Sequence, residues 1–235
     1  LYCGAQVDFV DIDPQSGNMC PQALATKLEF AQVSGQLPKV LIPVHFAGQP
    51  AQLAAIAALA RRYGFAVIED ASHAIGASYQ QEPVGSCRYS DICVFSFHPV
   101  KIITSAEGGM ATTNDAQLAR RMQLLRSHGI TALDAELTEL SHGPWYYEQQ
   151  LLGFNYRLTA LQAALGLGQL NQLSNFVRCR HELARDYDQL FASIPGVTPL
   201  QQATDCVSSY HLYVVLLDQA DRPRHSRRRR RRPSG

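Results

Sequence analysis

The chain has 235 residues, of which 46% are hydrophobic and 17% charged, so it can bury a full core and hold one domain or one and a half. Its formal net charge of +1 hides eight arginines in the last fourteen residues, and without them the body carries −7. No stretch approaches the roughly 20 apolar residues of a membrane helix, and no secretory signal opens the chain. We therefore expect a cytoplasmic protein with no membrane segment, whose acidic body does not bind nucleic acid.

The six cysteines form no CxxC pair and have no histidine at a zinc-like spacing. Cys93 lies within the apolar run DICVFSF, where a small buried thiol is the simplest interpretation. The sequence therefore predicts neither disulfides nor a metal site.

The first seventy residues alternate predicted strands and helices. Alternation of apolar and polar residues stops at a proline in the first strand, and the second helix ends on a glycine. Strands are predicted at 6–13, 40–46 and 66–70, and helices from Pro21 onward and at 51–64.

The remaining elements are less regular. The run 91–97 is too continuously apolar for an edge strand, so we expect it to be buried on both faces. A long helical stretch follows later, with Gly166 and Gly168 as expected bends. In order, the segments are a loop at 71–86, strands at 91–97 and 110–114, a helix at 115–128, an aromatic irregular segment at 130–150, helix at 159–191 and a strand at 211–218.

This alternation predicts an α/β fold with a mostly parallel sheet, and such sheets bind ligands at the carboxyl ends of their strands. Asp70 and Lys101 both follow predicted strands. We divide the chain into a large cofactor-binding domain at 1–165, a connecting helix with the start of a small domain at 166–220, and a disordered arginine-rich tail at 221–235.

A site that combines a carboxylate with one lysine suits pyridoxal phosphate, which needs an imine to an amine and an acid against its ring nitrogen. The chain has three lysines, and only Lys101 is well placed, because Lys27 lies within a helix and Lys39 precedes a strand. Partial desolvation makes such an amine a usable nucleophile and base. Asp70 would face the ring nitrogen, whereas Glu69 should point the opposite way and be structural.

Two further side chains are ambiguous. Ser96 either binds the cofactor's phosphate or satisfies backbone groups beside a buried strand. His73 is either a hydrogen-bonded structural residue or a neighbour of the cofactor's phenolic oxygen and ring.

Three motifs resemble the DegT family of sugar aminotransferases: VIEDASHAIGA at 67–77, FSFHPVKIITSAEGG at 95–109 and GFNYRLTALQAALG at 153–166. The resemblance runs from residue 1 to about 218 and implies the aspartate aminotransferase fold, a three-layer αβα large domain with a smaller C-terminal α+β domain. FHPVKIITSAEGG and HGPWYYEQQLLGFNYRLT are most similar to the enzymes of pseudaminic acid biosynthesis that aminate C4 of a UDP-linked 4-keto-6-deoxy sugar.

The resemblance implies roles for individual residues. Lys101 matches the lysine that binds the cofactor covalently and then shuttles the proton, and Asp70 matches the partner of the pyridine nitrogen. His73 matches the side chain near the ring and Ser96 a phosphate ligand. Asn155 matches an asparagine that reaches the phosphate in the neighbouring subunit, which implies a homodimer with shared active sites.

The implied reaction is a ping-pong transamination from an amino acid, expected to be glutamate, to the nucleotide-linked keto sugar. Trp145, Tyr146 and Tyr147 are candidates to line the sugar site, although aromatic residues in a loop serve equally often in packing or in dimer contacts.

The chain also departs from the family pattern. The family's N-terminal region with its other phosphate-binding loop is missing, the small domain should continue past residue 218, and Ala160 stands where an acidic residue is usual. The chain therefore resembles a fragment, and the missing loop should weaken cofactor binding and activity.

Three alternatives remain. The chain is an inactive or partly active fragment of that enzyme, or it is a sugar dehydratase of the same family, although dehydratases typically replace the lysine. The most remote alternative is a non-enzymatic protein that binds anionic polymers through the tail from Arg222. A shifted reading frame or a broken gene end would also explain this tail.

Overall fold

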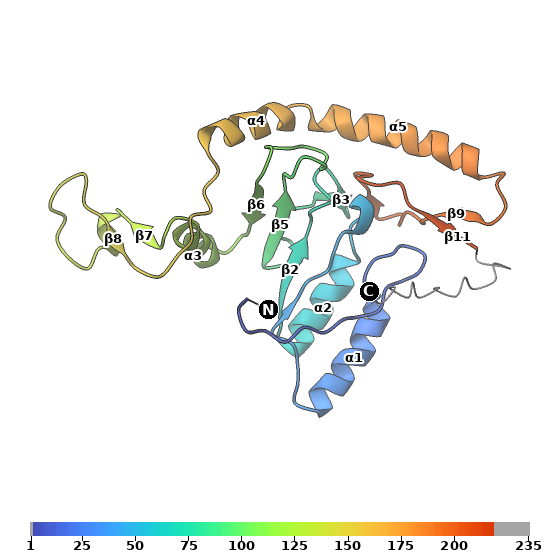
Figure 1. The fold of residues 1–235 in the computed structure, drawn as a ribbon. Helices are drawn as coiled ribbons and strands as arrows, with labels where there is room; N and C mark the ends of the chain where they lie inside the picture. Colours follow the sequence, from blue (N-terminus) through green and yellow to red (C-terminus); the bar gives the residue numbers. More distant parts are fainter. Residues whose placement is uncertain (1, 219–235) are drawn as a thin grey trace, which may run out of the picture.

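A computed structural model of the chain describes residues 2–218, so the predicted tail at 221–235 lies outside the described residues (Figure 1). Its main sheet has the order β1 (Val40–Leu41), β2 (Ala66–Asp70), β5 (Ile92–Ser96) and β6 (Gly109–Thr112). The first three strands are parallel, and β6 is antiparallel to β5. The predicted mostly parallel sheet is therefore confirmed.

Helices α1 (Pro21–Val33) and α2 (Leu53–Tyr63) cover one face of this sheet (Figure 1). Pro21 occupies the first turn of α1, where its missing N–H costs nothing. Gly64 ends α2 in the left-handed conformation and donates its N–H to the carbonyl of Ala60. The shared core contains Leu24, Leu28, Leu41, Ile56, Phe65 and Val67.

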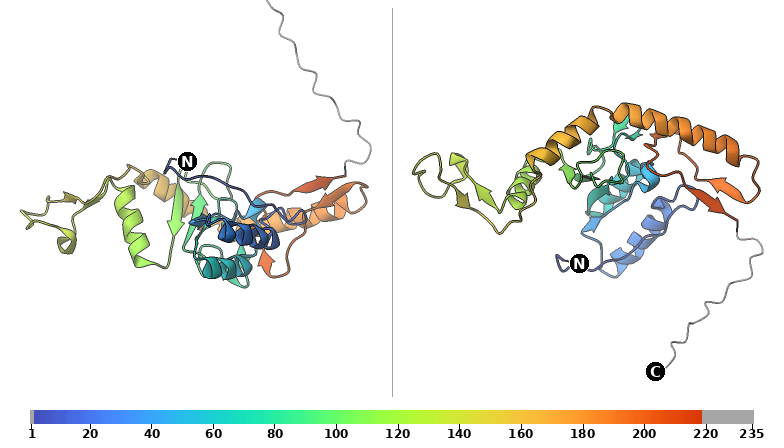
Figure 2. Two further views of the ribbon diagram at one scale, coloured as in Figure 1. Left: turned by 90° about the horizontal axis from the view of Figure 1, so that it is seen from below. Right: turned by 45° about the horizontal axis from the view of Figure 1, so that its top comes forward.

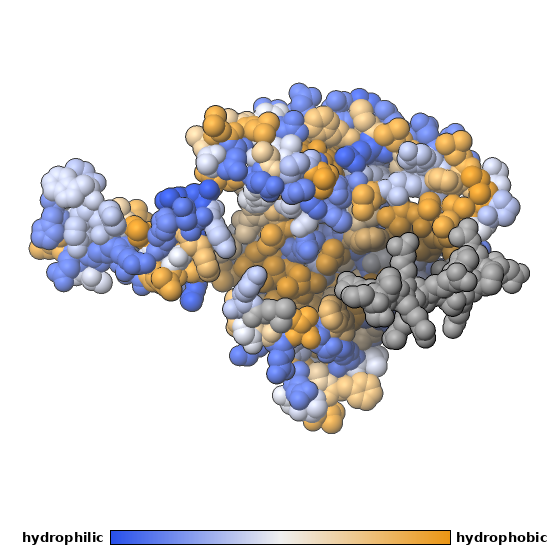
Figure 3. Space-filling model, viewed as in Figure 1, coloured by the Kyte–Doolittle hydropathy of each residue, from blue (hydrophilic) through white to orange (hydrophobic). Residues whose placement is uncertain are grey.

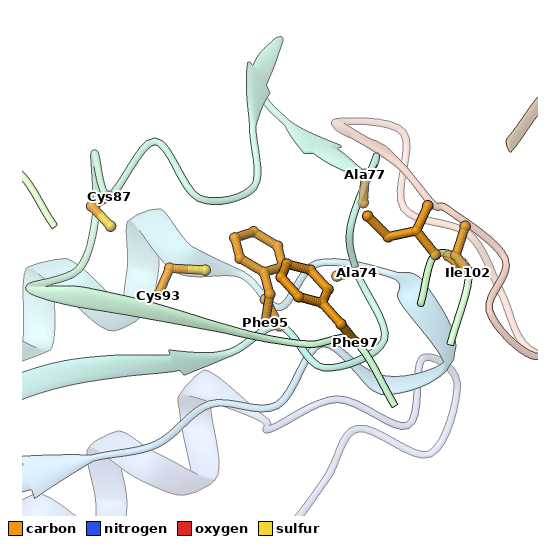
Figure 4. Packing of buried hydrophobic residues seen from close by; sticks show 9 residues of the cluster. Ala74, Ala77, Cys87, Cys93, Phe95, Phe97 and Ile102 are labelled. Atoms are coloured by element: carbon orange, nitrogen blue, oxygen red, sulfur yellow. The ribbon is translucent and has the colours of Figure 1, made fainter. Parts of the chain in front are cut away.

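A second buried cluster runs along β5 and reaches the loop that follows it (Figure 4). It joins Cys93 and Phe95 to Ile102 and Ile103, and side chains of α5 (Leu173–Phe191) pack against it. The cluster therefore anchors the loop that follows β5 to the body of the protein.

The other face of the sheet is open in the described part of the chain. Val94 in the middle of β5 is 38% exposed and Val44 is 42% exposed, and apolar surface gathers over β2 and β5 (Figure 3). The prediction that the strand at 91–97 is buried on both faces is therefore wrong. β5 is central in the sheet as expected, but within residues 2–218 its side chains on this face are only partly covered.

The segment 6–13 is not a strand, contrary to its alternating pattern. It forms only an isolated bridge between Ile12 and Met19, and Phe9 is 81% exposed. Alternation indicates a strand only where a neighbouring strand offers backbone partners, and the described residues provide none here.

The helical stretch 159–191 is divided into α4 (Ala160–Leu170) and α5. The break lies at residues 171–172, so the predicted bends at Gly166 and Gly168 are wrong. Both glycines lie within α4, which begins with a capping box between Thr159 and Gln162.

The segment between β6 and α4 forms an arm that projects from the body in every view (Figures 1 and 2). Arg120 of α3 pairs with Glu136 and thereby holds the arm's base. The arm contains α3 (Ala116–Arg126), β7 (Ile130–Thr131), the short 3-10 helix η2 (Asp134–Glu136) and β8 (Glu148–Gln149).

After α5 the chain returns to the body of the protein. β9 (Val197–Pro199) pairs with β11 (Val215–Leu217), which confirms part of the strand predicted at 211–218. Between them, β10 (Cys206–Val207) pairs with β3 (Ser78–Tyr79), itself paired with β4 (Glu82–Pro83). This return brings the segment 208–212 against the 3-10 turn η1 (Phe46–Gly48). Among the helices described, none is long and apolar enough to cross a bilayer.

Candidate active site

Asp70 ends β2 and is fixed by its own backbone. Its N–H donates to the carbonyl of Pro43 at 2.9 Å, and its carbonyl accepts from the N–H of His45 at 3.0 Å. Its carboxylate accepts from the N–H of Ser72 at 3.0 Å through Oδ1. Asp70 lies opposite Val94 in the β2–β5 register, so the two side chains share the open face of the sheet.

Ser96 ends β5 on the same face, two residues beyond Val94. Its hydroxyl is half-buried and accepts a long hydrogen bond of 3.4 Å from the N–H of His98. The carboxyl ends of two parallel strands thus present a carboxylate and a hydroxyl side by side, where ligands bind in sheets of this kind.

Lys101 lies in the turn after β5. Its N–H donates to the carbonyl of His98 at 2.9 Å, and the next two residues, Ile102 and Ile103, are buried. The loop closes where the N–H of Ser105 donates to the carbonyl of Phe97 at 3.0 Å. The backbone of Lys101 is therefore held from both sides, and the residue is half-buried.

His73 lies close enough to Lys101 and Asp70 for their charges to act on it. Burial lowers the pKa of His73, the positive charge of Lys101 lowers it further, and Asp70 opposes both. Its Nδ1 is buried and has no partner among the described residues. The structure therefore brings together three of the residues that the sequence selected.

His211 joins this group, and the sequence interpretation missed it. Its ring centroid lies 4.4 Å from that of His73, with a tilt of 37°. Burial, followed by the charges of His73 and Lys101, lowers the pKa of His211 to about 4. The only sequence signal was a serine- and histidine-bearing start, SSYH, to the apolar run at 211–218, which by itself indicates no site.

Glu69 points away from this site, as predicted. It is 2% exposed and accepts a hydrogen bond of 2.8 Å from Nε2 of His45 and another from the hydroxyl of Ser90. Adjacent residues of β2 therefore supply a carboxylate to each face, one for the site and one for the interior.

The remaining predicted residues belong to the arm between β6 and α4, which projects away from the main sheet (Figure 1). Asn155 is exposed, and its Oδ1 accepts from Nη2 of Arg157 at 3.1 Å. Trp145 and Tyr147 are 73% and 61% exposed, and the hydroxyl of Tyr146 donates to Glu148 at 3.0 Å. The chain does not bring these four residues to the site by itself.

The residues at the site fit pyridoxal phosphate chemically. The half-buried carboxylate of Asp70 complements a protonated ring nitrogen, and the amine of Lys101 complements a carbonyl carbon. The imidazole of His73, whose Nδ1 has no partner among residues 2–218, has hydrogen-bonding capacity left for a ligand, and the hydroxyl of Ser96 can donate to a phosphate.

Comparison with known proteins gives a consistent picture. The model of the DegT/DnrJ/EryC1/StrS aminotransferase family matches residues 1–229. The spore coat polysaccharide biosynthesis protein SpsC of Bacillus subtilis (strain 168) is 39% identical over 220 residues, which cover 93% of this chain and 54% of SpsC.

Two solved structures are similar in fold. Helicobacter pylori PseC, an aminotransferase involved in the biosynthesis of pseudoaminic acid, superposes with a TM-score of 0.80 at 34% identity, covering 93% of this chain and 54% of PseC. The putative sugar aminotransferase Spr1654 of Streptococcus pneumoniae, in its PLP form, gives 0.75 at 26% identity over 93% of this chain and 56% of its own. The aminotransferase fold is therefore confirmed, and the chain spans about half the length of these relatives.

Proposed function

The chain belongs to the DegT/DnrJ/EryC1/StrS aminotransferase family, and from this premise we propose that it forms part of a pyridoxal-phosphate-dependent enzyme that transfers an amino group from an amino acid to a nucleotide-linked keto sugar. The observation that carries this proposal is the convergence of Lys101, Asp70 and His73 beyond the carboxyl ends of β2 and β5. The names of SpsC and PseC, which concern polysaccharide and sugar biosynthesis, support the substrate class.

Each residue has a separate task in this proposal. When bound, pyridoxal phosphate supplies an electron sink for negative charge that develops at a carbon losing its proton. Asp70 holds the ring nitrogen protonated, which requires a carboxylate fixed in position. The backbone pairing of Asp70 with residues 43–45 and the bond from Ser72 provide that fixation.

Lys101 moves the proton. Its amine removes a proton from the amino donor and returns one to the sugar carbon in the second half-reaction, so it must be held still yet reach two substrates. The turn at 98–101 and the buried Ile102 and Ile103 hold its backbone, and the half-buried side chain keeps its reach. His73 and Ser96 position the ring and the phosphate.

The finer proposal concerns substrates and assembly. The acceptor is C4 of a UDP-linked 4-keto-6-deoxy sugar on the route to pseudaminic acid, the donor is glutamate, and the enzyme is a cytoplasmic homodimer. In that dimer Asn155 reaches the phosphate in the neighbouring subunit, and Trp145, Tyr146 and Tyr147 line its sugar site. The exposure of Asn155, Trp145 and Tyr147 in a single chain supports this arrangement.

Reduction with borohydride tests the proposal directly. The chain is incubated with pyridoxal phosphate, reduced, digested and mapped by mass spectrometry, and we expect a pyridoxyl adduct on Lys101. Lys101→Ala should abolish the adduct, whereas the matched variant Lys39→Ala should retain it. An adduct elsewhere, or none in a chain extended to the length of the relatives, would refute the assignment.

Product analysis then separates the aminotransferase from a dehydratase. The extended chain is supplied with glutamate and a UDP-linked 4-keto-6-deoxy sugar, and we expect 2-oxoglutarate and a 4-amino sugar nucleotide in equal amounts. A deoxygenated keto sugar, formed with 2-oxoglutarate and free ammonia and carrying no amino group, would identify the dehydratase instead. Running the 235-residue chain in parallel measures how much activity it has by itself.

A further inference from the structure

Three segments that are distant in sequence meet beside His73. Ser209, which is fully buried, joins them: its N–H donates to the carbonyl of Gly48 at 3.0 Å, and its hydroxyl donates to the carbonyl of His73 at 3.0 Å. The turn at 46–48, the loop after β2 and the segment 208–212 are thus tied together at one residue.

The turn at 46–48 is shaped for this contact. Gly48 has φ +102°, and a Cβ at this position would lie 2.7 Å from Oγ of Ser209, 2.9 Å from the backbone nitrogen of His211 and 3.0 Å from the carbonyl oxygen of His73. Both the conformation and the close approach therefore require glycine.

The segment 208–212 is also held from its outer side. Nη1 of Arg180, on α5, donates to the carbonyls of Tyr210 and His211 at 3.0 and 3.2 Å, and the N–H of Leu212 donates to the carbonyl of Ala47 at 3.2 Å. Tyr210 has φ +47°, a conformation that a bulky residue adopts only when its surroundings impose it. The surroundings here impose the position of His211.

We propose that His211 is a positioning residue that acts through His73, whose ring it holds against the bound cofactor, so that a segment beyond α5 controls the geometry of the site on the sheet. The inference rests on the proposed function. Ser209 fixes the main chain of His73, and the ring of His211, 4.4 Å away, fixes its side chain. Because neither Nδ1 has a partner among the described residues, ring packing is the contact that carries the effect.

The contact itself is tested without cofactor. In the chain labelled with ¹⁵N-histidine, the ring resonances of His73 are identified by their loss in His73→Gln. We expect His211→Ala to shift these resonances and His211→Phe, which retains a ring, to shift them less. The matched control His142→Ala, on the arm, should leave them unchanged. Unchanged His73 resonances in His211→Ala would overturn the inference.

A double-mutant cycle on cofactor affinity tests the route of the effect. The Kd for pyridoxal phosphate is measured by absorbance in the wild type, His211→Ala, His73→Ala and the double variant. We expect His211→Ala to raise Kd about tenfold, which corresponds to about 1.4 kcal/mol, when His73 is present and not at all when it is absent. An equal tenfold effect in the His73→Ala background would show that His211 acts independently and would overturn the inference.

Separate control experiments detect variants that fail to fold and failure of the proposed function. Thermal melts identify variants that fail to fold, and His211→Leu, which retains side-chain volume but has no ring, replaces His211→Ala in that case with the same expected results. Absence of a Lys101 adduct in the chain extended to the length of the relatives overturns the proposed function. The His73 resonances are read without cofactor, so they distinguish that failure from failure of the contact.

Discussion

The imidazole of His45 donates through Nε2 to the carboxylate of Glu69 at 2.8 Å, with both side chains buried behind the strand that presents Asp70. The N–H of Ala51 donates to Nδ1 of His45 at 3.1 Å, which leaves the proton on Nε2 and fixes one neutral tautomer. The same residue, through its backbone, pairs with Asp70. A buried polar network therefore supports the strand end that carries the site.

Glu69→Ala should destabilise the protein by about 3 kcal/mol, because it leaves the buried Nε2–H of His45 without its partner and removes the hydrogen bond from the half-buried hydroxyl of Ser90. Urea or thermal unfolding measures the change. Glu82→Ala breaks the exposed pair with Arg88 and should cost about 1 kcal/mol or less. Equal losses in the two variants would contradict the structural role of the buried carboxylate.

Gly48→Ala should be the most damaging of three glycine substitutions, with a loss of at least about 2 kcal/mol, because its Cβ would collide with Ser209 and the backbone of His211. A Cβ at Gly64 would contact nothing, so Gly64→Ala should lower the free energy of unfolding by only about 1 kcal/mol, the cost of the left-handed conformation for alanine. Gly168→Ala, in the exposed interior of α4, should stabilise by up to about 1 kcal/mol. Unfolding curves should show this order. A mild effect of Gly48→Ala would contradict the close contact between the turn at 46–48 and the segment 208–212.

Stability should fall on acidification because of His211. Its pKa is lowered from 6.5 to about 4 in the folded chain, so the unfolded chain binds the proton more readily. The stabilising contribution of the neutral ring is therefore present above pH 6.5 and is lost as the pH falls toward 4. Between pH 7 and 5, the Tm of the wild type should fall by roughly 2 to 4 °C more than that of His211→Phe. Parallel Tm profiles would refute this assignment.

Asp70→Asn should lower the rate of transamination by about 100-fold or more, because the amide cannot hold the ring nitrogen protonated. Its Oδ1 still accepts from Ser72, so the thermal stability should change little. Asp115→Asn, which retains the cap of α3, is the matched control and should change neither quantity. Steady-state kinetics of the extended chain provide the measurement, and a near-normal rate would remove Asp70 from the proposed chemistry.

Mixing two inactive variants should restore activity if active sites are shared. Lys101→Ala and Asn155→Ala subunits, unfolded and refolded together in equal amounts, would give mixed dimers with one intact site in two, or about a quarter of the wild-type activity. The two variants refolded separately and then combined serve as the control. No recovery in the mixture would place Asn155 in its own subunit's site or outside the site.

Elements with their own local signals were predictable from the sequence. The apolar spacing of α2 and its closing Gly64 specify that helix without help from other segments. The strand ends likewise selected Asp70 and Lys101, because topology alone places the carboxyl ends of parallel strands together.

Features that depend on distant partners were not predictable. The segment 6–13 has the alternation of a strand but no neighbouring strand among the described residues. His211 reaches the site through contacts such as that of Ser209 with His73, across 136 residues, and no spacing encodes a separation of that size. The sequence also left open whether His73 is a structural residue or a neighbour of the cofactor, because that choice depends on how close His73 lies to Lys101 in the folded chain.

The separation of 136 residues between His73 and Ser209 also determines the order in which parts of the site emerge during synthesis. At about 5 to 20 residues per second, this separation means that Ser209 leaves the ribosome roughly 7 to 27 s after His73. The strands that present Asp70, Ser96 and Lys101 are therefore complete long before the segment that holds His73. A nascent chain therefore passes through a stage in which Asp70, Ser96 and Lys101 are assembled but His73 is unsupported, and the proposed role of His211 implies that cofactor affinity rises once translation has passed this residue.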